Sequence, residues 1–205
     1  MHKKGIVMGT SGIITLVVIA VIIFYGASIY NKLVALKNRY ENGFAQIEVQ
    51  LKRRYDLIPN LIETAKGYLN HERGTLEAVV NARNLAMNGL SAAAANPGDA
   101  AAMGGLANAE KMLAGALGKL NVVVENYPDL KANTNMQQLS EELTTTENKV
   151  SFARQAFNDF VTEYNTYRQS FPPIFLANFF GHTSDAELLE FEDSEQIQHA
   201  PKVSF

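Results

Sequence analysis

The chain has 205 residues, no cysteine and a formal net charge of −3 at pH 7. This length leaves room for one domain of ordinary size beside a membrane segment, and the lack of cysteine excludes disulfides and thiolate chemistry. The basic residues form no long run with interleaved aromatic side chains, so we expect no nucleic acid among the partners.

A hydrophobic run near the N-terminus predicts a transmembrane helix. Residues 1–12 form a short polar N-terminus with Lys3 and Lys4, and residues 13–30 carry no charge. A helix that crosses a bilayer needs roughly 20 apolar residues, which this run approaches. A cleaved signal peptide is the alternative, but the helical pattern continues through the small residues 26–28, so we favour an uncleaved anchor. Basic residues flank both ends of the run and leave the side of the soluble domain undecided.

The same helical pattern continues from the anchor into a soluble domain, residues 31–181. From Leu33 onward apolar residues recur at three- and four-residue steps, which places them on one helix face. Pro59 lacks a backbone donor and predicts a kink or a restart, which Asp56 is placed to cap. Gly74 is a second weak point of this helix.

Two further long helices are predicted after a stretch rich in alanine and glycine. A turn at residues 96–99 precedes a helix that ends near Glu125, and the last long helix runs from about Asn135 to Ser170. The sequence therefore predicts an all-α fold, in which an N-terminal transmembrane helix continues into an antiparallel up-and-down bundle of three to four long helices.

Several stretches of the domain resemble one known family. The longest is QLKRRYDLIPNL at residues 50–61, and ENYPDLKA at residues 125–132 is a second. With shorter matches in the same order, they cover most of residues 30–181, and there the chain is similar to the LemA family. The resemblance implies a single-pass protein of the bacterial cell (inner) membrane with an all-helical domain. It does not imply an enzyme, because the family has no agreed biochemical activity.

The sequence carries no pattern typical of a catalytic, cofactor-binding or metal site. Phosphate-binding loops, nucleophile elbows, dinucleotide fingerprints and zinc motifs are absent. His71 is the one histidine in the predicted bundle, and it lacks the second histidine four residues later that a zinc-binding helix needs. We therefore expect no cofactor and no metal, and we rank a hydrolase last among the functions considered.

A charged group on the first long helix is the candidate interaction surface. On a helical wheel Arg54 falls at the edge of the apolar stripe. An arginine beside a core must reach solvent or find an acceptor, so we predict a structural ion pair between Arg54 and Glu147, or Glu142, on the last helix. Alternatively, Arg54 belongs to a recognition surface for a partner or an anionic lipid. That surface comprises Arg53, Arg54, Asp56, Asn60 and Glu63.

An aromatic segment after the last long helix is the candidate docking segment. Residues 171–180 are too few to span a bilayer and too apolar to be left in water. The bundle itself, the membrane interface or an adjacent subunit could bury them. With three alternating helices, residue 171 lies far from the bilayer, and we favour that geometry. An added reversal at Asp56 or Gly74 would bring it near the lipid. The aromatic members are Phe171, Phe175, Phe179 and Phe180.

The remaining residues, 182–205, are predicted to form an irregular acidic tail, because six acidic side chains stand there against Lys202 alone.

The first functional hypothesis is a non-enzymatic single-pass membrane protein that acts as a self-associating helical scaffold. An anchor fixes every copy at the same height, and long helices offer side surfaces for lateral contact. The alternative is an adaptor that binds another membrane protein, such as a protease or a signalling component. The expected partners are therefore the lipid bilayer, further copies of the chain and, in the alternative, that other membrane protein.

Overall fold

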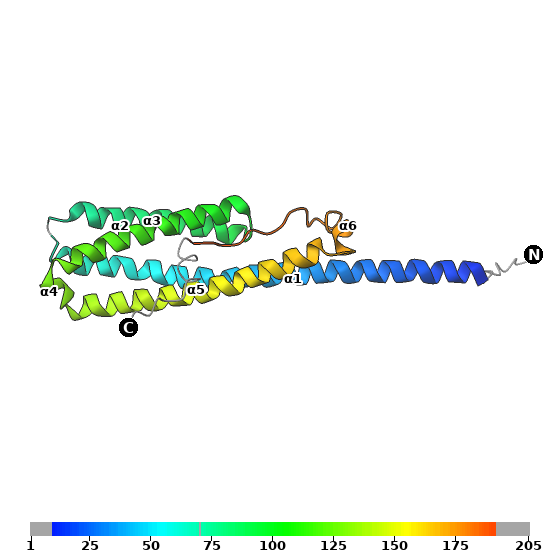
Figure 1. Ribbon diagram of the computed structural model, residues 1–205, viewed down its shortest axis with the longest axis horizontal. Coiled ribbons are helices and arrows are strands. Elements are labelled where there is room, and N and C mark those ends of the chain that lie inside the picture. The colour runs from blue at the N-terminus through cyan, green and yellow to red at the C-terminus, as the bar shows by residue number, and fades with distance from the viewer. Residues whose placement is uncertain (1–9, 70, 192–205) are drawn as a thin grey trace, which may run out of the picture.

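The computed structural model describes residues 10–69 and 71–191 of the chain. The helices are α1 (Thr10–Lys66), α2 (Arg73–Ala95), α3 (Ala100–Glu125), α4 (Pro128–Lys131), α5 (Thr134–Gln169) and α6 (Pro173–Ala177). Within the described residues all regular secondary structure is helical, so the predicted all-α bundle is confirmed. α1 and α5 form a long pair, and α2 and α3 form a hairpin beside the half of this pair that lies away from the N-terminus (Figure 1).

α1 is one helix that holds both the hydrophobic run and the first wall of the bundle. Its large apolar side chains from Ile13 to Tyr25 are exposed, and this stretch is long and apolar enough to cross a membrane. From Ile29 onward one face of α1 is buried. Pro59 lies inside α1 without ending it, so the predicted restart is wrong. Buried neighbours such as Ile58 hold the helix against the bundle despite the backbone hydrogen bond that proline removes.

Aromatic rings hold α1 and α5 together in an antiparallel arrangement. Phe157 of α5 contacts the rings of Tyr40 and Phe44 edge to face, with centroids 6.3 and 5.6 Å apart. Gly43 lies between them on α1, and a Cβ atom there would come within 2.8 Å of the Phe160 ring. The glycine therefore allows the close approach of the two helices at this level.

The reversal between α1 and α2 decides between the two geometries that the sequence left open for residue 171. α1 ends at Lys66 and α2 begins at Arg73, so the described chain has four long helices and α5 runs back toward the N-terminal end of α1 (Figure 1). Residue 171 therefore lies beside the end of the hydrophobic run, and the geometry that placed it at the far end of the bundle is wrong. The physical reason is the added reversal just before Gly74, the second weak point recognised in the sequence.

Residues 182–191 are extended and run back along α5 toward the hairpin of α2 and α3 (Figure 1). They carry neither helix nor strand, yet Ala186 and Leu189 are buried. Gly98, in the turn between α2 and α3, has a φ of +85°, and its carbonyl accepts a hydrogen bond from the Glu187 amide at 2.8 Å. The first part of the predicted irregular tail is thus docked on the bundle, and residues 192–205 lie outside the described residues.

Candidate functional site

A buried ion pair joins α1 to α3 inside the bundle. Arg54 Nη1 donates a hydrogen bond to Glu110 Oε2 at 3.0 Å, and the two side chains are 8% and 3% exposed. The Tyr55 hydroxyl donates to the other carboxylate oxygen, Glu110 Oε1. One carboxylate therefore accepts from two residues of α1, and these side chains hold α3 to α1 at this point.

Burial dominates the electrostatics of this cluster. The pKa of Glu110 is raised, chiefly because burial disfavours the charged carboxylate, while Arg54 and the Tyr55 hydroxyl oppose that shift. Nearby Glu147 adds to the increase. The pKa of Tyr55 is raised far above its usual range by its own burial and by the negative charge of Glu110. Tyr55 therefore keeps its proton and remains a hydrogen-bond donor.

The predicted partner of Arg54 is wrong, because its acceptor is Glu110 on α3 and not Glu147 or Glu142 on α5. The wheel placed Arg54 correctly at a buried edge, but it carries no information about which helix faces that edge. Glu110 was not predicted as the partner of Arg54, although the sequence does carry a signal for it. Glu110 falls four residues after Leu106 and three before Leu113 on the buried face of α3, where a carboxylate needs a partner.

A cleft with a volume of about 350 Å³ opens above this ion pair between α3 and α5. Ala114 and Gly115 leave space on the α3 side. Arg154 of α5 is buried at the cleft, and its guanidinium lies 4.5 Å from the centre of the Phe191 ring, in cation–π contact. The cleft therefore combines charged side chains with a wall formed by the docked tail.

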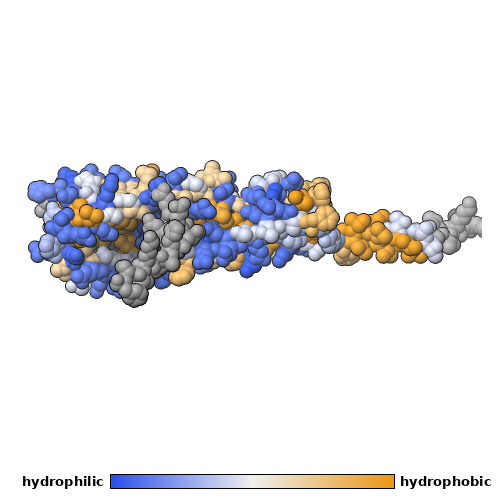
Figure 2. Space-filling model, viewed as in Figure 1, coloured by the Kyte–Doolittle hydropathy of each residue, from blue (hydrophilic) through white to orange (hydrophobic). Residues whose placement is uncertain are grey.

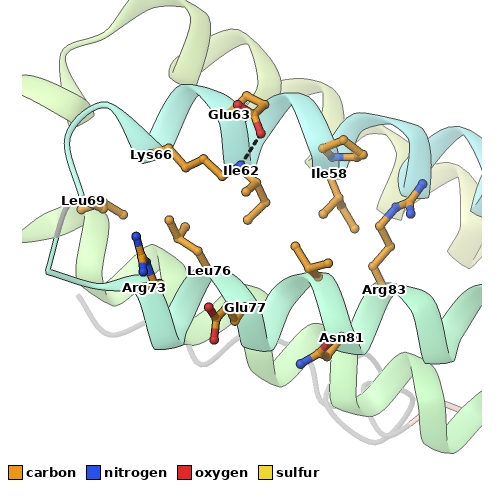
Figure 3. A pocket seen from close by; sticks show the side chains of 12 residues that line it. Ile58, Ile62, Glu63, Lys66, Leu69, Arg73, Leu76, Glu77, Asn81 and Arg83 are labelled. Atoms are coloured by element: carbon orange, nitrogen blue, oxygen red, sulfur yellow. Dashed lines mark hydrogen bonds and ion pairs between the residues drawn. The ribbon is translucent and has the colours of Figure 1, made fainter.

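A larger groove, with a volume of about 850 Å³, lies between α1 and α2 at the far end of the bundle. Apolar side chains of the two helices point toward one another across it, and charged side chains stand along its edges (Figure 3). Glu63 and Lys66 form an ion pair there, and Arg83 Nε donates to the Tyr55 carbonyl at 2.7 Å. The apolar residues that line the groove are Ile58, Pro59, Ile62, Leu69, Leu76 and Val80.

The predicted interaction surface is not one surface. Arg54 is buried, whereas Arg53, Asp56, Asn60 and Glu63 are exposed. Glu63 lies at the groove between α1 and α2, and Arg53 lines a separate hollow against α5. The structure therefore separates Arg54 from the other four residues and turns Arg53 and Glu63 toward different helices.

Two asparagines of α5 bind the backbone of the tail, a feature that the sequence analysis missed. The Asn165 side chain donates to the Ala186 carbonyl and accepts from the Ala186 amide, both at 2.9 Å. The Asn158 side chain does the same at Leu189, at 3.1 and 2.9 Å. Seven helical residues and three extended residues each span about 10 Å, so the two spacings match. We call Asn158 and Asn165 the asparagine clamp.

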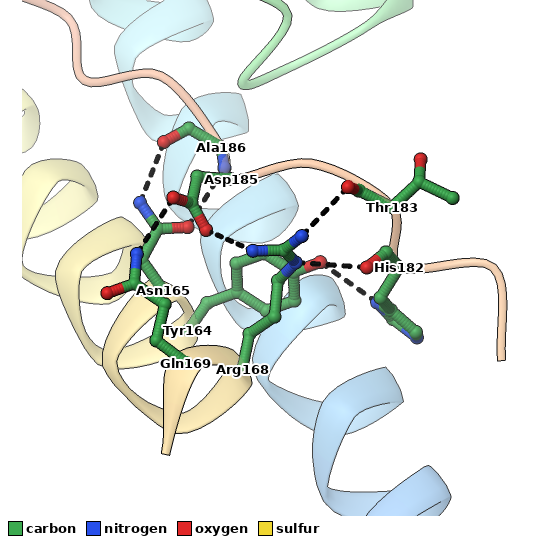
Figure 4. A network of polar contacts seen from close by, with 8 residues as sticks. All are labelled: Tyr164, Asn165, Arg168, Gln169, His182, Thr183, Asp185 and Ala186. Atoms are coloured by element: carbon green, nitrogen blue, oxygen red, sulfur yellow. Dashed lines mark hydrogen bonds and ion pairs between the residues drawn. The ribbon is translucent and has the colours of Figure 1, made fainter. Parts of the chain in front are cut away.

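Arg168 holds the beginning of the tail. Its Nε donates to the His182 carbonyl at 2.9 Å, and its Nη2 donates to the Thr183 carbonyl at 2.8 Å. Its Nη1 forms an ion pair with Asp185 at 2.6 Å, and Gln169 binds the other oxygen of the same carboxylate (Figure 4). The start of the acidic tail is therefore fixed by a charge from α5 as well as by the clamp.

Docking of this segment should weaken when the pH falls below about 6.5, the usual pKa of histidine. His182 is buried, and its Nδ1 contacts the Tyr164 hydroxyl at 2.9 Å. Burial, with Lys37 and Arg168 nearby, lowers the pKa of His182. A lowered histidine pKa means that protonation favours the undocked state, so stability is present above pH 6.5 and is lost as the pH falls through the lowered pKa.

Hydrogen exchange of the Leu189 amide, corrected for its intrinsic pH dependence, measures this effect. We expect protection to fall between pH 7.5 and pH 5.5 in the natural chain. The variant His182→Gln has no titrating group at this position, so its protection should change less over that range. Equal pH dependence in both proteins would contradict the role of His182.

The aromatic segment lies beside α1, where the hydrophobic run ends. Phe180 contacts Tyr30 edge to face with centroids 5.3 Å apart, and α6 packs on α1. Three other phenylalanines point away from the bundle and are exposed by 79%, 73% and 84%: Phe171, Phe175 and Phe179. The structure thus brings the predicted docking segment to the end of the domain that adjoins the hydrophobic run and leaves most of its aromatic surface uncovered.

Comparison with known proteins agrees with the resemblance seen in the sequence. The model of the LemA family matches residues 43–205, a range that includes Arg54, Glu110 and the asparagine clamp. The curated Protein LemA of Metamycoplasma hominis is 25% identical over 136 residues, which cover 66% of this chain and 58% of that relative. The chain therefore spans less than two thirds of the relative's length. Because the family match covers more than half of the sequence, the chain belongs to the LemA family.

Proposed function

We propose that this protein is a non-enzymatic, single-pass protein of the bacterial inner membrane that acts as a self-associating helical scaffold. The observation that carries the proposal is the continuity of α1, which runs unbroken from the exposed apolar stretch to the far end of the bundle. A helix that leaves a membrane and forms the first wall of a domain holds every copy at one height. Copies anchored in this way meet side by side, which favours lateral contacts.

Exposed apolar side chains on the flanks of the bundle support lateral association. Phe152 on α5 is 74% exposed, and Val49, Met112 and Val122 on α1 and α3 are also exposed. Isolated apolar side chains are common on protein surfaces. Phe152 is the largest of this group, and an aromatic side chain of that size gains most from burial against a second copy.

The polar cluster inside the bundle supports a structural role. Arg54, Tyr55 and Glu110 satisfy one another by hydrogen bonds. Buried polar groups that hydrogen-bond one another help to define a single fold. The LemA family is not known as an enzyme family.

The groove between α1 and α2 favours a second candidate, an adaptor for another membrane protein. Its apolar floor and charged edges suit an amphipathic helix, which places its apolar face into such a groove. An adaptor needs no contact between copies. Under this hypothesis we therefore expect the purified protein to be a monomer until its partner is present.

The mass of the purified full chain in mild detergent, measured by light scattering across a range of concentrations, separates the two candidates. A homogeneous particle of several chains supports the scaffold. Phe152→Ser should then reduce its mass, and Lys149→Ser, an exposed change on the same helix, should not. A monomer at every concentration contradicts the scaffold. Growth of that monomer when membrane extract is added favours the adaptor.

A further inference from the structure

The aromatic segment lies at the level where the hydrophobic run of α1 ends. α1 carries no charged side chain from Thr10 to Asn31, and Lys32 is its first charge. Twenty helical residues cover about 30 Å, the thickness of the hydrocarbon core, so this stretch reaches one membrane boundary close to Tyr30. Phe180 contacts Tyr30. Residues 171–180 therefore lie at the level where α1 leaves the bilayer.

The segment has an inner side and an outer side. On the inner side Ala177 is buried, Phe180 is half-buried, and Ile29 of α1 is covered. On the outer side the phenylalanines at steps of four residues remain exposed, and the Phe171 and Phe175 ring centroids are 6.0 Å apart. The bundle thus holds α6 firmly while leaving one apolar side without cover. The exposed residues are Phe171, Ile174, Phe175 and Phe179.

The aromatic segment is nearly free of charge, which is unusual for an exposed part of a protein. Apart from His182, no acidic or basic side chain occurs between Arg168 and Asp185. Figure 2 shows that the apolar surface at the α6 end of the bundle adjoins the apolar surface of the exposed part of α1. Aromatic side chains concentrate at membrane boundaries, where they meet both the headgroups and the hydrocarbon.

We propose that residues 171–180 insert into the interfacial layer of the same bilayer that α1 crosses, as a second membrane contact. Lipid is the occupant that fits, because the uncovered side continues the apolar surface of the anchor at the same height. A second copy would have to reach a patch that already adjoins lipid. Apolar helix faces that lie in this layer enter only about 5–10 Å, a depth that suits the short α6.

The second contact has a mechanical consequence. A domain held by one helix can rotate about the axis of that helix and tilt on it. A contact displaced from the axis opposes both motions, so α6 would orient the bundle on the membrane. This inference goes beyond the proposed scaffold function and holds for the adaptor as well, because it needs only an anchored chain.

The chain contains no tryptophan, so one introduced tryptophan is a unique reporter. The test uses the full chain with Phe175→Trp in vesicles of phosphatidylcholine and phosphatidylglycerol, either unmodified or with acyl chains brominated near the headgroup. Bromine quenches tryptophan on contact. The matched control is Phe152→Trp, which replaces an equally exposed phenylalanine about 25 Å back along α5 from its C-terminal end. Phe179→Trp is a second reporter in case one position perturbs α6.

Brominated lipid should reduce the emission of Phe175→Trp and Phe179→Trp by about twofold or more, with little change for the control, if the segment lies in the interface. A blue-shifted emission that brominated lipid does not quench places the segment against protein, such as a second copy, and overturns the proposal. A red-shifted, unquenched emission places it in water and overturns the proposal as well.

Discussion

Replacing Glu110 with glutamine should lower the free energy of unfolding by about 3–5 kcal/mol, because the charge of Arg54 then stays buried without a counter-charge. Glutamine has nearly the same shape as glutamate, so the change tests the charge and leaves the packing in place. For a domain of this size the melting temperature should fall by on the order of 10 °C. Thermal unfolding of the full chain in detergent, followed by circular dichroism, measures the loss.

Two controls separate the ion pair from general effects of charge. Glu147→Gln alters an exposed carboxylate that lines the same cleft, and Arg53→Ala removes the exposed neighbour of Arg54. Each should change stability by no more than about 1 kcal/mol. If Glu110→Gln melts at the same temperature as Glu147→Gln, the pair does not stabilise the bundle.

Removing both members of the ion pair should cost less than removing one. Arg54→Met combined with Glu110→Leu should recover much of the loss, because it removes both charges. Tyr55 then keeps the Ala86 carbonyl, 3.5 Å away, as its acceptor.

Removing the asparagine clamp with Asn158→Ala and Asn165→Ala should release the tail and leave the bundle folded. Four hydrogen bonds to the tail backbone are lost, each worth about 0.5–1.5 kcal/mol, so docking should weaken by about 2–6 kcal/mol. The helices of the bundle do not depend on these bonds. Their content, measured by circular dichroism, should therefore stay nearly constant.

Hydrogen exchange reports directly on the clamp, because the Ala186 and Leu189 amides donate to the two asparagine side chains. A loss of 2 kcal/mol corresponds to roughly 30-fold faster exchange through the undocked state. Asn148→Ala changes an exposed asparagine on the same helix and should leave both amides protected. Unchanged protection in the double variant would mean that burial of Leu189 alone holds the tail.

The sequence was sufficient where the apolar pattern alone decides the outcome. The step of three and four residues from Leu33 onward found the buried face of α1, and the absence of charge over residues 13–30 found the stretch that can cross a membrane. Both features depend on hydrophobic burial, which the pattern of side chains reports directly.

The sequence was insufficient where the outcome depends on how helices are ordered around the bundle. A wheel shows that Arg54 faces inward, but only the reversal before Arg73 brings α3 and Glu110 to that face. The same reversal decides where residue 171 lies. The clamp is harder still to anticipate, because an asparagine side chain that binds backbone groups has no fixed sequence pattern in its partner.

Because α1 is unbroken, it also fixes the distance between the membrane boundary and the groove between α1 and α2. From Tyr30 to Pro59 the helix rises about 40 Å, so the groove at its far end stands at that distance from the membrane boundary. A tilt of about 20°, usual for a membrane helix, would swing the groove sideways by about 15 Å. Any protein that enters the groove must therefore extend that far from the lipid. The angle at which α1 emerges then sets the place above the membrane where the groove stands.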